Sequence, residues 1–275
     1  MSYSTTSSID KDRPSYPPDQ IAEIVEQFHR EGYYCFGQVL SEDEIAALKN
    51  GMDDVYDNEE LHGDEEGDYI RGISLLRMFE QNINFRDLII REPFISVVEA
   101  ILGADCHLMS QNALRNGAGE GVTGWHVDDR LLFPLPDGVE RHDPRIRVPC
   151  FVINLLIPLT DVDGLEFGPT QVVPGSHYSG GNPGRQEDLS FEGGGPVSLT
   201  GKAGLAYMFH NQVWHRGHPN SSDRVRYVGG ITYSQRVVSQ RFYPFLNYRM
   251  PDYVLDGAND RMLRLLGKHK KAAYG

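Results

Sequence analysis

From Cys106 onward the sequence consists of short apolar runs separated by glycine, proline and asparagine. Runs of this length and spacing are typical of a sandwich or barrel built from short strands. We therefore predict a mainly β fold with flanking helices. The expected strands cover His107–Arg115, Val148–Leu159, Thr170–Val173, Val197–Thr200, Leu205–Phe209 and Val225–Val237.

The first 105 residues carry helical patterns instead. Apolar residues recur three and four positions apart within residues 21–32, which predicts an amphipathic helix, and a short strand is expected at Tyr33–Leu40. The segment Ser41–Glu44 has the pattern of a capping box and predicts the start of a second helix. A third helical stretch, Asn84–Leu102, contains Pro93, so a break is expected there.

A chain of 275 residues can bury a sizeable core, and nothing in this sequence requires a second domain. We predict a single domain with three regions. Residues 1–105 form a mostly helical support, residues 106–240 form the β core, and residues 241–275 form a C-terminal lid or helix that includes a short closing helix at Arg261–Leu266. Three loops are expected to shape a site: Arg130–Arg147, Ser179–Gly195 and the aromatic Phe242–Tyr253.

The formal net charge is −13, and the longest basic run is Lys268–Lys271. This charge disfavours nucleic acid and anionic membrane surfaces as partners and favours a small-molecule substrate. No apolar run approaches the roughly 20 residues that span a bilayer, and the N-terminus lacks a signal pattern, so a cytoplasmic location is expected. The three cysteines form no paired motif, and we expect them to be reduced and buried.

A His-x-Asp motif, His126-Val127-Asp128, is expected directly after a strand. In an extended backbone residues i and i+2 point to the same side, so one face offers an imidazole and a carboxylate together. A second histidine from a distant strand would complete the 2-His-1-carboxylate set that binds Fe(II) and leaves coordination positions open. A three-residue motif alone is weak evidence, because it also occurs by chance.

A downstream segment strengthens this interpretation. His215 follows one predicted strand, and Arg226 starts the next, so a hairpin is expected to bring both residues to one end of the barrel. The planar fork of an arginine binds a carboxylate through two hydrogen bonds and stays charged when it is partly buried. Arg226 therefore suits the distal carboxylate of a 2-oxo diacid.

Together these residues resemble the phytanoyl-CoA dioxygenase family of non-haem iron oxygenases. The likeness includes the capping box, the His-x-Asp motif, the Pro174–His177 turn, and the distal spacing of His215, Asn220, Ser222 and Arg226.

The resemblance implies a double-stranded β-helix core, also called a jelly roll or cupin-like fold. It implies that iron is bound by His126, Asp128 and His215, with 2-oxoglutarate and O₂ as co-substrates. Arg226 would hold the 5-carboxylate of 2-oxoglutarate. Further co-substrate contacts are expected from Gln111, with Asn112 as the reserve candidate, and from Trp125. Some relatives carry a serine two residues after the distal histidine, where this chain has Gly217.

Several residues also have a simpler interpretation. The three ligands could be core histidines and a solvated carboxylate in a metal-free barrel, and Trp125 could be a core aromatic residue. His210 and His218 match no ligand position, and the resemblance gives His177 a structural role in its turn. A basic cluster of Arg141, His142, Arg145 and Arg147 is either a solvated loop or a contact for an anionic part of the substrate.

Oxidative decarboxylation of 2-oxoglutarate would release succinate and CO₂ and oxidise a substrate C–H bond. Hydroxylation is the expected outcome, and desaturation, cyclisation and epimerisation stay open. Halogenation is disfavoured, since Asp128 fills the position that a halide would need. Two rival functions remain: a metal-binding sensor barrel without turnover, and a zinc or manganese hydrolase or isomerase.

Overall fold

The computed structural model describes residues 3, 6–62, 69–184, 189–243 and 247–270. Two antiparallel sheets form its centre. The larger sheet has the strand order β1-β8-β5-β10-β4-β3-β2, and the smaller has the order β7-β6-β9. The strands are β1 (Tyr33–Gln38), β2 (Ile70–Arg71), β3 (Ser74–Leu76), β4 (His107–Asn116), β5 (Val152–Pro158), β6 (Thr170–Val172), β7 (Val197–Leu199), β8 (Leu205–His210), β9 (His215–Gly217) and β10 (Arg226–Ser234).

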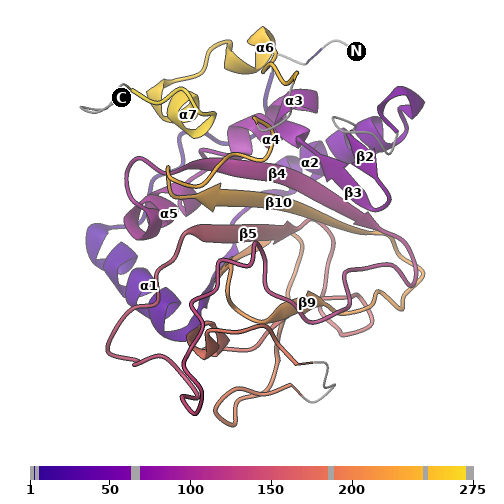
Figure 1. Ribbon diagram of the computed structural model, residues 1–275. Coiled ribbons are helices and arrows are strands. Elements are labelled where there is room, and N and C mark those ends of the chain that lie inside the picture. Colours follow the sequence, from indigo (N-terminus) through magenta and orange to yellow (C-terminus); the bar gives the residue numbers. More distant parts are fainter. Residues whose placement is uncertain (1–2, 4–5, 63–68, 185–188, 244–246, 271–275) are drawn as a thin grey trace.

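Helices cover one face of the larger sheet. They are α1 (Pro18–Glu31), α2 (Glu42–Tyr56), α3 (Met78–Gln81), α4 (Ile83–Leu88), α5 (Phe94–Leu102), α6 (Asp252–Leu255) and α7 (Asp260–Leu265), with short 3₁₀ turns at Glu59–Leu61 and Ser176–Ser179. Figure 1 shows α3, α4 and α7 above the larger sheet, with β9 and the long loops below it. The mainly β class with flanking helices is therefore confirmed.

The main core lies between the helices and the larger sheet. Apolar residues one helical turn apart, such as Leu48 and Met52 of α2, are buried against strand residues such as Leu155 and Ile231. Burying this apolar surface favours the layered arrangement. The opposite face of the larger sheet and the smaller sheet enclose a space that carries polar side chains.

Most predicted elements appear with shifted ends. Pro93 separates α4 from α5, as expected. The predicted strand Val148–Leu159 pairs only from Val152 onward. The short elements β2, β3, β9, α3 and α6 were not predicted, because segments of two to four residues carry no measurable periodicity.

The N-terminal region contributes strands as well as helices. Its strand β1 pairs with β8 of the β core, and its strand β3 pairs with β4 of the β core. At the other end, the apolar residues Met262 and Leu265 of α7 join the main core, so this helix packs on the helical side of the sheet instead of covering the β9 side as a lid. That the whole chain forms one domain stays a prediction.

Two further expectations concern the surface of the molecule. In the described part of the chain, no helix combines the length and the apolar character needed to cross a membrane. Cys106 and Cys150 are buried and unpaired, as expected, whereas Cys35 is exposed on β1. The prediction that all three cysteines are buried is therefore wrong for Cys35.

Glu44 connects the start of α2 to two other segments. Its carboxylate accepts the backbone N–H of Ser41, which closes the predicted capping box, and the backbone N–H of Asp10. The guanidinium of Arg91 donates to both carboxylate oxygens, at 2.8 and 3.1 Å. Burial raises the pKa of Glu44. These hydrogen bonds and the charge of Arg91 lower this pKa by more than burial raises it, so the carboxyl titrates below its ordinary value.

The Glu44→Ala variant should lose about 3–5 kcal/mol of unfolding free energy, because it leaves Arg91 buried without its counter-charge. Urea denaturation measures this loss. Glu42→Ala is the matched control, since Glu42 lies in the same helical turn but is exposed. A loss for Glu44→Ala within 1 kcal/mol of the control would contradict the role given to this ion pair.

Candidate metal centre

His126 and His215 lie side by side on neighbouring backbone segments. They exchange two backbone hydrogen bonds, His126 N–H to His215 C=O and His215 N–H to His126 C=O, both 3.0 Å long. In an antiparallel pair of this kind the two side chains point to the same face. The imidazole centroids are accordingly 4.2 Å apart.

Asp128 completes a group of three donors. Ligand atoms of His126, Asp128 and His215 all lie within 4.8 Å of one another. The Nε2 atoms of His126 and His215 stand 3.7 and 3.4 Å from the two carboxylate oxygens of Asp128. Across the described ranges, no other set of histidines, cysteines and acidic residues meets this criterion.

The hydrogen bonds of the two imidazoles indicate that the three donors suit a cation. His126 Nδ1 donates to the Gly124 carbonyl at 2.7 Å, and His215 Nδ1 donates to the Val213 carbonyl at 2.9 Å. A neutral imidazole that donates from Nδ1 has a lone pair on Nε2. Two lone pairs and a carboxylate therefore converge, and a bound cation resolves their repulsion. Burial, and secondly the proximity of the His215 imidazole, lower the pKa of His126 and favour this neutral form.

Asp128 is held by two further contacts, one of its carboxylate and one of its backbone. Its Oδ2 accepts a hydrogen bond from Asn154 Nδ2 at 2.8 Å, and its backbone N–H donates to the Asn211 carbonyl at 3.0 Å. Burial raises the pKa of Asp128, but the neighbouring His215, and after it His126 and Arg241, lower this pKa more, so the carboxyl stays ionised.

The chain turns sharply after this ligand. Asp129 and Arg130 both adopt left-handed backbone conformations, with φ of 62° and 46°. Left-handed conformations are unfavourable for residues other than glycine. The side chain of Asp129 forms an ion pair with Arg241, which lies beyond the end of β10. This contact ties the turn to the C-terminal region.

Arg226 opens β10 and is only 5% exposed. Its NH2 group lies 3.5 Å from Thr170 Oγ1, which also accepts a 2.7 Å hydrogen bond from the Tyr207 hydroxyl. Its Nε–H is buried and has no hydrogen-bond partner among the residues described. No carboxylate of the described residues lies within ion-pair distance of Arg226, and burial lowers the pKa of its guanidinium. A buried cation without a protein counter-charge is unfavourable, so this position suits an anionic ligand.

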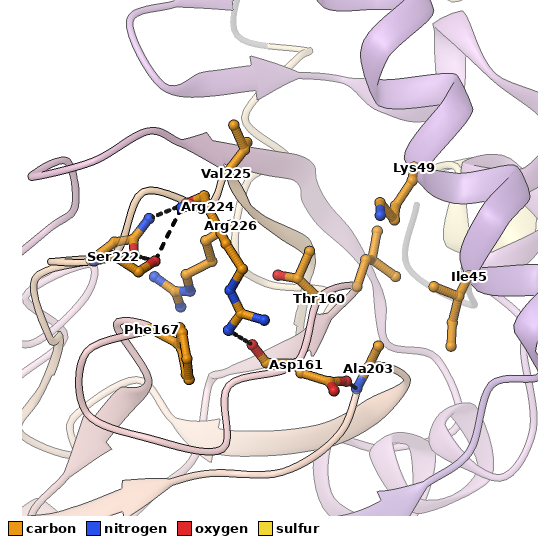
Figure 2. Close-up of a pocket in the computed structure, with 12 residues that line it drawn as sticks. Ile45, Lys49, Thr160, Asp161, Phe167, Ala203, Ser222, Arg224, Val225 and Arg226 are labelled. Carbon is orange, nitrogen blue, oxygen red and sulfur yellow. Dashed lines mark hydrogen bonds between the residues drawn. The ribbon is translucent and has the colours of Figure 1, made fainter.

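The other residues of the distal motif shape the turn that leads to Arg226. Asn220 Nδ2 donates to the carbonyl of Arg224 at 2.7 Å, and the Ser222 hydroxyl donates to Asn220 Oδ1 at 2.7 Å. Arg224 lies beside Arg226, over the ring of Phe167, and its NH2 group donates to the backbone carbonyl of Asp161 at 3.4 Å (Figure 2). The spacing from His215 to Arg226 therefore corresponds to one folded turn.

A single cavity of about 430 Å³ joins the triad to Arg226. All three triad residues and Arg226 line it. Its other polar lining residues are Ser74, Asn112, Asn116, Asn154, Thr170, Arg216, Thr232 and Arg241. Asp128 is the one carboxylate in this lining.

The structure separates the two candidates on β4. Asn112 lines the cavity, whereas Gln111 points to the other face, where its Nε2 donates to the Phe85 carbonyl at 2.6 Å. The first candidate is therefore misplaced, because successive side chains of a strand face opposite sides. Trp125 lines a neighbouring cavity, and its ring lies beneath the guanidinium of Arg216 at 4.7 Å. It is thus not placed to contact a co-substrate at Arg226.

Contrary to the prediction, the motif His126–Asp128 does not directly follow a strand. β4 ends at Asn116, and the motif lies in an isolated bridge to β9. His177 and His210 pack against each other at a centroid distance of 5.2 Å, away from the triad. Burial lowers the pKa of His177 to about 4 and holds the pKa of His210 well below its ordinary value, so both are neutral structural residues. His218 lines neither cavity beside the triad.

The basic cluster predicted at 141–147 does not reach the cavity. Its three arginines form ion pairs with Glu192, Asp143 and Glu26, respectively. His142 bonds to the Phe133 carbonyl. The solvated-loop interpretation therefore agrees with the structure better than a substrate contact does.

Sequence reasoning missed several residues of the site. Thr170 and Asn154 look like ordinary strand residues in the sequence, and Arg241 lies outside every recognised motif. The available signal was the two-residue period of a strand, which places Thr170 on the same face as Val172. That signal identifies a face but does not say what the face encloses.

Comparisons with known proteins agree with this geometry. Residues 28–228 match the family model described as phytanoyl-CoA dioxygenase. The L-proline trans-4-hydroxylase of Streptomyces griseoviridis is 25% identical over 248 residues, covering 79% of this chain and 87% of that protein. The ectoine dioxygenase of Stutzerimonas stutzeri is 28% identical over 164 residues, covering 57% of this chain and half of that protein.

Two solved structures share the fold. The 2-oxoglutarate-dependent epimerase SnoN from nogalamycin biosynthesis superposes with a TM-score of 0.60 at 18% identity, covering 80% of this chain and 84% of that one. HygX from Streptomyces hygroscopicus, with nickel, 2-oxoglutarate and hygromycin B bound, gives 0.60 at 16% identity, covering 79% and 88%. These likenesses confirm the jelly-roll core, and the family match covers well over half of the sequence. The chain therefore belongs to the phytanoyl-CoA dioxygenase family and is a non-haem iron, 2-oxoglutarate-dependent oxygenase.

Proposed function

We propose that His126, Asp128 and His215 hold Fe(II), that Arg226 binds the 5-carboxylate of 2-oxoglutarate, and that the enzyme hydroxylates a C–H bond of a small molecule. One observation carries the co-substrate assignment. Arg226 is a buried cation without a carboxylate partner among the described residues, and it shares a cavity with the three donors.

The donor set suits the metal. Two neutral imidazoles and one carboxylate on one side of an ion are the ligand set of Fe(II) oxygenases, and they leave positions for a co-substrate and O₂. Bound iron with 2-oxoglutarate and O₂ supplies the oxidant and releases succinate and CO₂. Asp128 fills the carboxylate position, which disfavours halogenation.

The protein side chains provide orientation and shielding. Thr170 and Tyr207 hold the guanidinium of Arg226, and Asn154 fixes the carboxylate of Asp128. Asn112 lies in the cavity and takes the role of the second co-substrate contact in place of Gln111. At Gly217 an added Cβ would stand 3.7 Å from Arg226 NH1, so glycine leaves room beside the arginine where some relatives carry serine.

The substrate class is a small molecule. The relatives named above act on L-proline and ectoine, and hygromycin B is bound in a HygX structure. Desaturation, cyclisation and epimerisation use the same oxidant, and the neighbour SnoN is an epimerase. Hydroxylation is our proposal because the curated relatives are a hydroxylase and a dioxygenase. A cytoplasmic location stays a prediction.

Anaerobic addition of Fe(II) and 2-oxoglutarate to the protein should produce a visible metal-to-ligand charge-transfer band. The band should vanish in Asp128→Ala, which loses a ligand, and persist in Asp143→Ala, which changes a partly exposed aspartate in an ion pair with Arg145. Succinate release in air separates the oxygenase from a sensor barrel. A parent protein without the band would contradict the iron and 2-oxoglutarate assignment.

Arg226→Gln should raise the Kd for 2-oxoglutarate about a hundredfold, because losing one partner of a buried charge pair costs roughly 2–5 kcal/mol. Fe(II) affinity should change little. Titration of the charge-transfer band measures both quantities. Arg224→Gln is the matched control, since Arg224 lies two residues earlier on the adjacent turn. Equal 2-oxoglutarate affinities in the two variants would sink the assignment of Arg226.

A further inference from the structure

We infer that Asn116 is a second binding residue for the 5-carboxylate of 2-oxoglutarate and supplies a contact that Gly217 cannot make. This inference rests on the proposed function, because it adds a hydrogen-bond donor to the carboxylate site assigned to Arg226. Asn116 is the last residue of β4 and belongs to none of the sequence motifs described above.

The register of the larger sheet places Asn116 directly opposite Arg226. In an antiparallel pair, opposite residues point to the same face, and their Cβ atoms are roughly 4.5–5.5 Å apart. Both residues line the metal cavity. The two-residue period of the strands agrees with this placement, since Leu114 on β4 and Val228 on β10 line the same cavity. Asn116 and Arg226 are therefore neighbours on the inner face of the sheet.

The amide of Asn116 is buried without a hydrogen-bond partner among the described residues. The residue has an exposed fraction of 0%, and neither Nδ2 nor Oδ1 forms a hydrogen bond. Its backbone carbonyl, in contrast, accepts a hydrogen bond from Asn220 Nδ2 at 3.4 Å. Buried side-chain amides are unfavourable unless they are hydrogen-bonded. The side chain therefore suits a ligand that brings an acceptor into the cavity.

Arg226 offers a second unpartnered donor beside this amide. Its Nε–H is also buried and has no hydrogen-bond partner within the described part of the chain. Two residues that face each other across the strands thus hold unused donors in one cavity. A carboxylate only accepts hydrogen bonds, and it has two oxygens, so it can accept one from each residue. The 5-carboxylate of 2-oxoglutarate is such a group.

Gly217 indicates why a second donor is needed at this position. It lines the metal cavity from β9, and a Cβ added to it would stand 3.7 Å from Arg226 NH1. A serine at this position, as in some relatives, would therefore place its hydroxyl near the guanidinium. Glycine has no side chain to donate. Asn116 offers a donor to the same group from β4 instead.

Asn112 cannot serve the same carboxylate. It lies opposite Gly230 in the same register, four residues before Asn116. The two asparagines are therefore roughly 13 Å apart along the strand. One carboxylate group is much smaller than this separation, so a carboxylate held by Arg226 can reach only the amide that lies opposite Arg226.

The test uses the full chain, kept anaerobic and loaded with Fe(II), and follows the charge-transfer band during titration with 2-oxoglutarate. Asn116→Leu keeps the size of the side chain and removes its donor, so the Kd for 2-oxoglutarate should rise about tenfold. Asn116→Asp should raise this Kd further, because its carboxylate pairs with Arg226 and repels the co-substrate. The Fe(II) affinity of both variants should equal that of the wild type.

2-Oxovalerate distinguishes a contact with the 5-carboxylate from a structural role, because it carries a methyl group in place of that carboxylate. Calorimetry on the iron-loaded protein measures its Kd, which should not rise in Asn116→Leu or in Asn116→Asp. The preference for 2-oxoglutarate over 2-oxovalerate should therefore fall about tenfold or more. The matched control is Asn84→Asp, which changes a buried asparagine of α4 that accepts the backbone N–H of Ser8. It should leave both Kd values unchanged.

Two results would overturn the inference: a Kd for 2-oxoglutarate in the Asn116 variants within about threefold of the wild-type value, or an equal rise in Kd for the two 2-oxo acids. Asn116→Asp is nearly isosteric, so it decides the question even where the leucine variant does not fold. Both results leave the wild-type charge-transfer band intact. A wild-type protein that forms no band overturns the proposed function itself, and this inference with it.

Discussion

The reciprocal pair of backbone hydrogen bonds between His126 and His215 is the contact on which the site depends. It joins a loop segment to the edge strand β9 of the smaller sheet, and it sets both imidazoles on one face. Each imidazole then donates from Nδ1 to a carbonyl two residues earlier in its own chain segment. Backbone geometry alone therefore fixes the position and the tautomer of two metal ligands. Side-chain packing has only to place Asp128 between them.

The electrostatic pattern of the cavity suits two ligands of opposite charge. Three electron-pair donors converge, and one buried guanidinium has no ion-pair partner among the described residues. Buried charges are stable only when they are paired. A divalent ion and a dicarboxylate together would supply both partners. The protein is thus built to be completed by its ligands, and their binding should contribute to the stability of the folded state.

Much of the fold and of the triad could be predicted from the sequence. The capping box at Ser41–Glu44, the break at Pro93 and the start of β10 at Arg226 each leave a local signature that survives without tertiary information. The choice between Gln111 and Asn112 as the co-substrate contact could not be made in this way. β4 is buried on both faces along His107–Gln111, so polarity does not alternate and the sequence carries no record of which face encloses the site.

Other details depend on contacts between distant segments. Arg216 is a polar residue beside a ligand, and only its place between Gln171 and Trp125 distinguishes it from the arginines at 141–147. The basic cluster attracted attention in the sequence because its members are close together along the chain. In the structure their partners are nearby carboxylates, whereas Arg216, on a strand of three residues, forms no ion pair with a described residue. Charge density along a sequence is thus a poor guide to unpaired charge in space.

The two left-handed residues after Asp128 also bear on how such an enzyme can change. Asp129 and Arg130 reverse the chain, and the backbone N–H of Asp128 is already held by Asn211. The backbone at the metal ligand is therefore defined on the near side of the reversal, and the long loop up to Arg147 hangs beyond it. Insertions and replacements in that loop are therefore expected to leave the iron ligands in place. The reversal acts as a mechanical boundary between the metal centre and the loop that follows it.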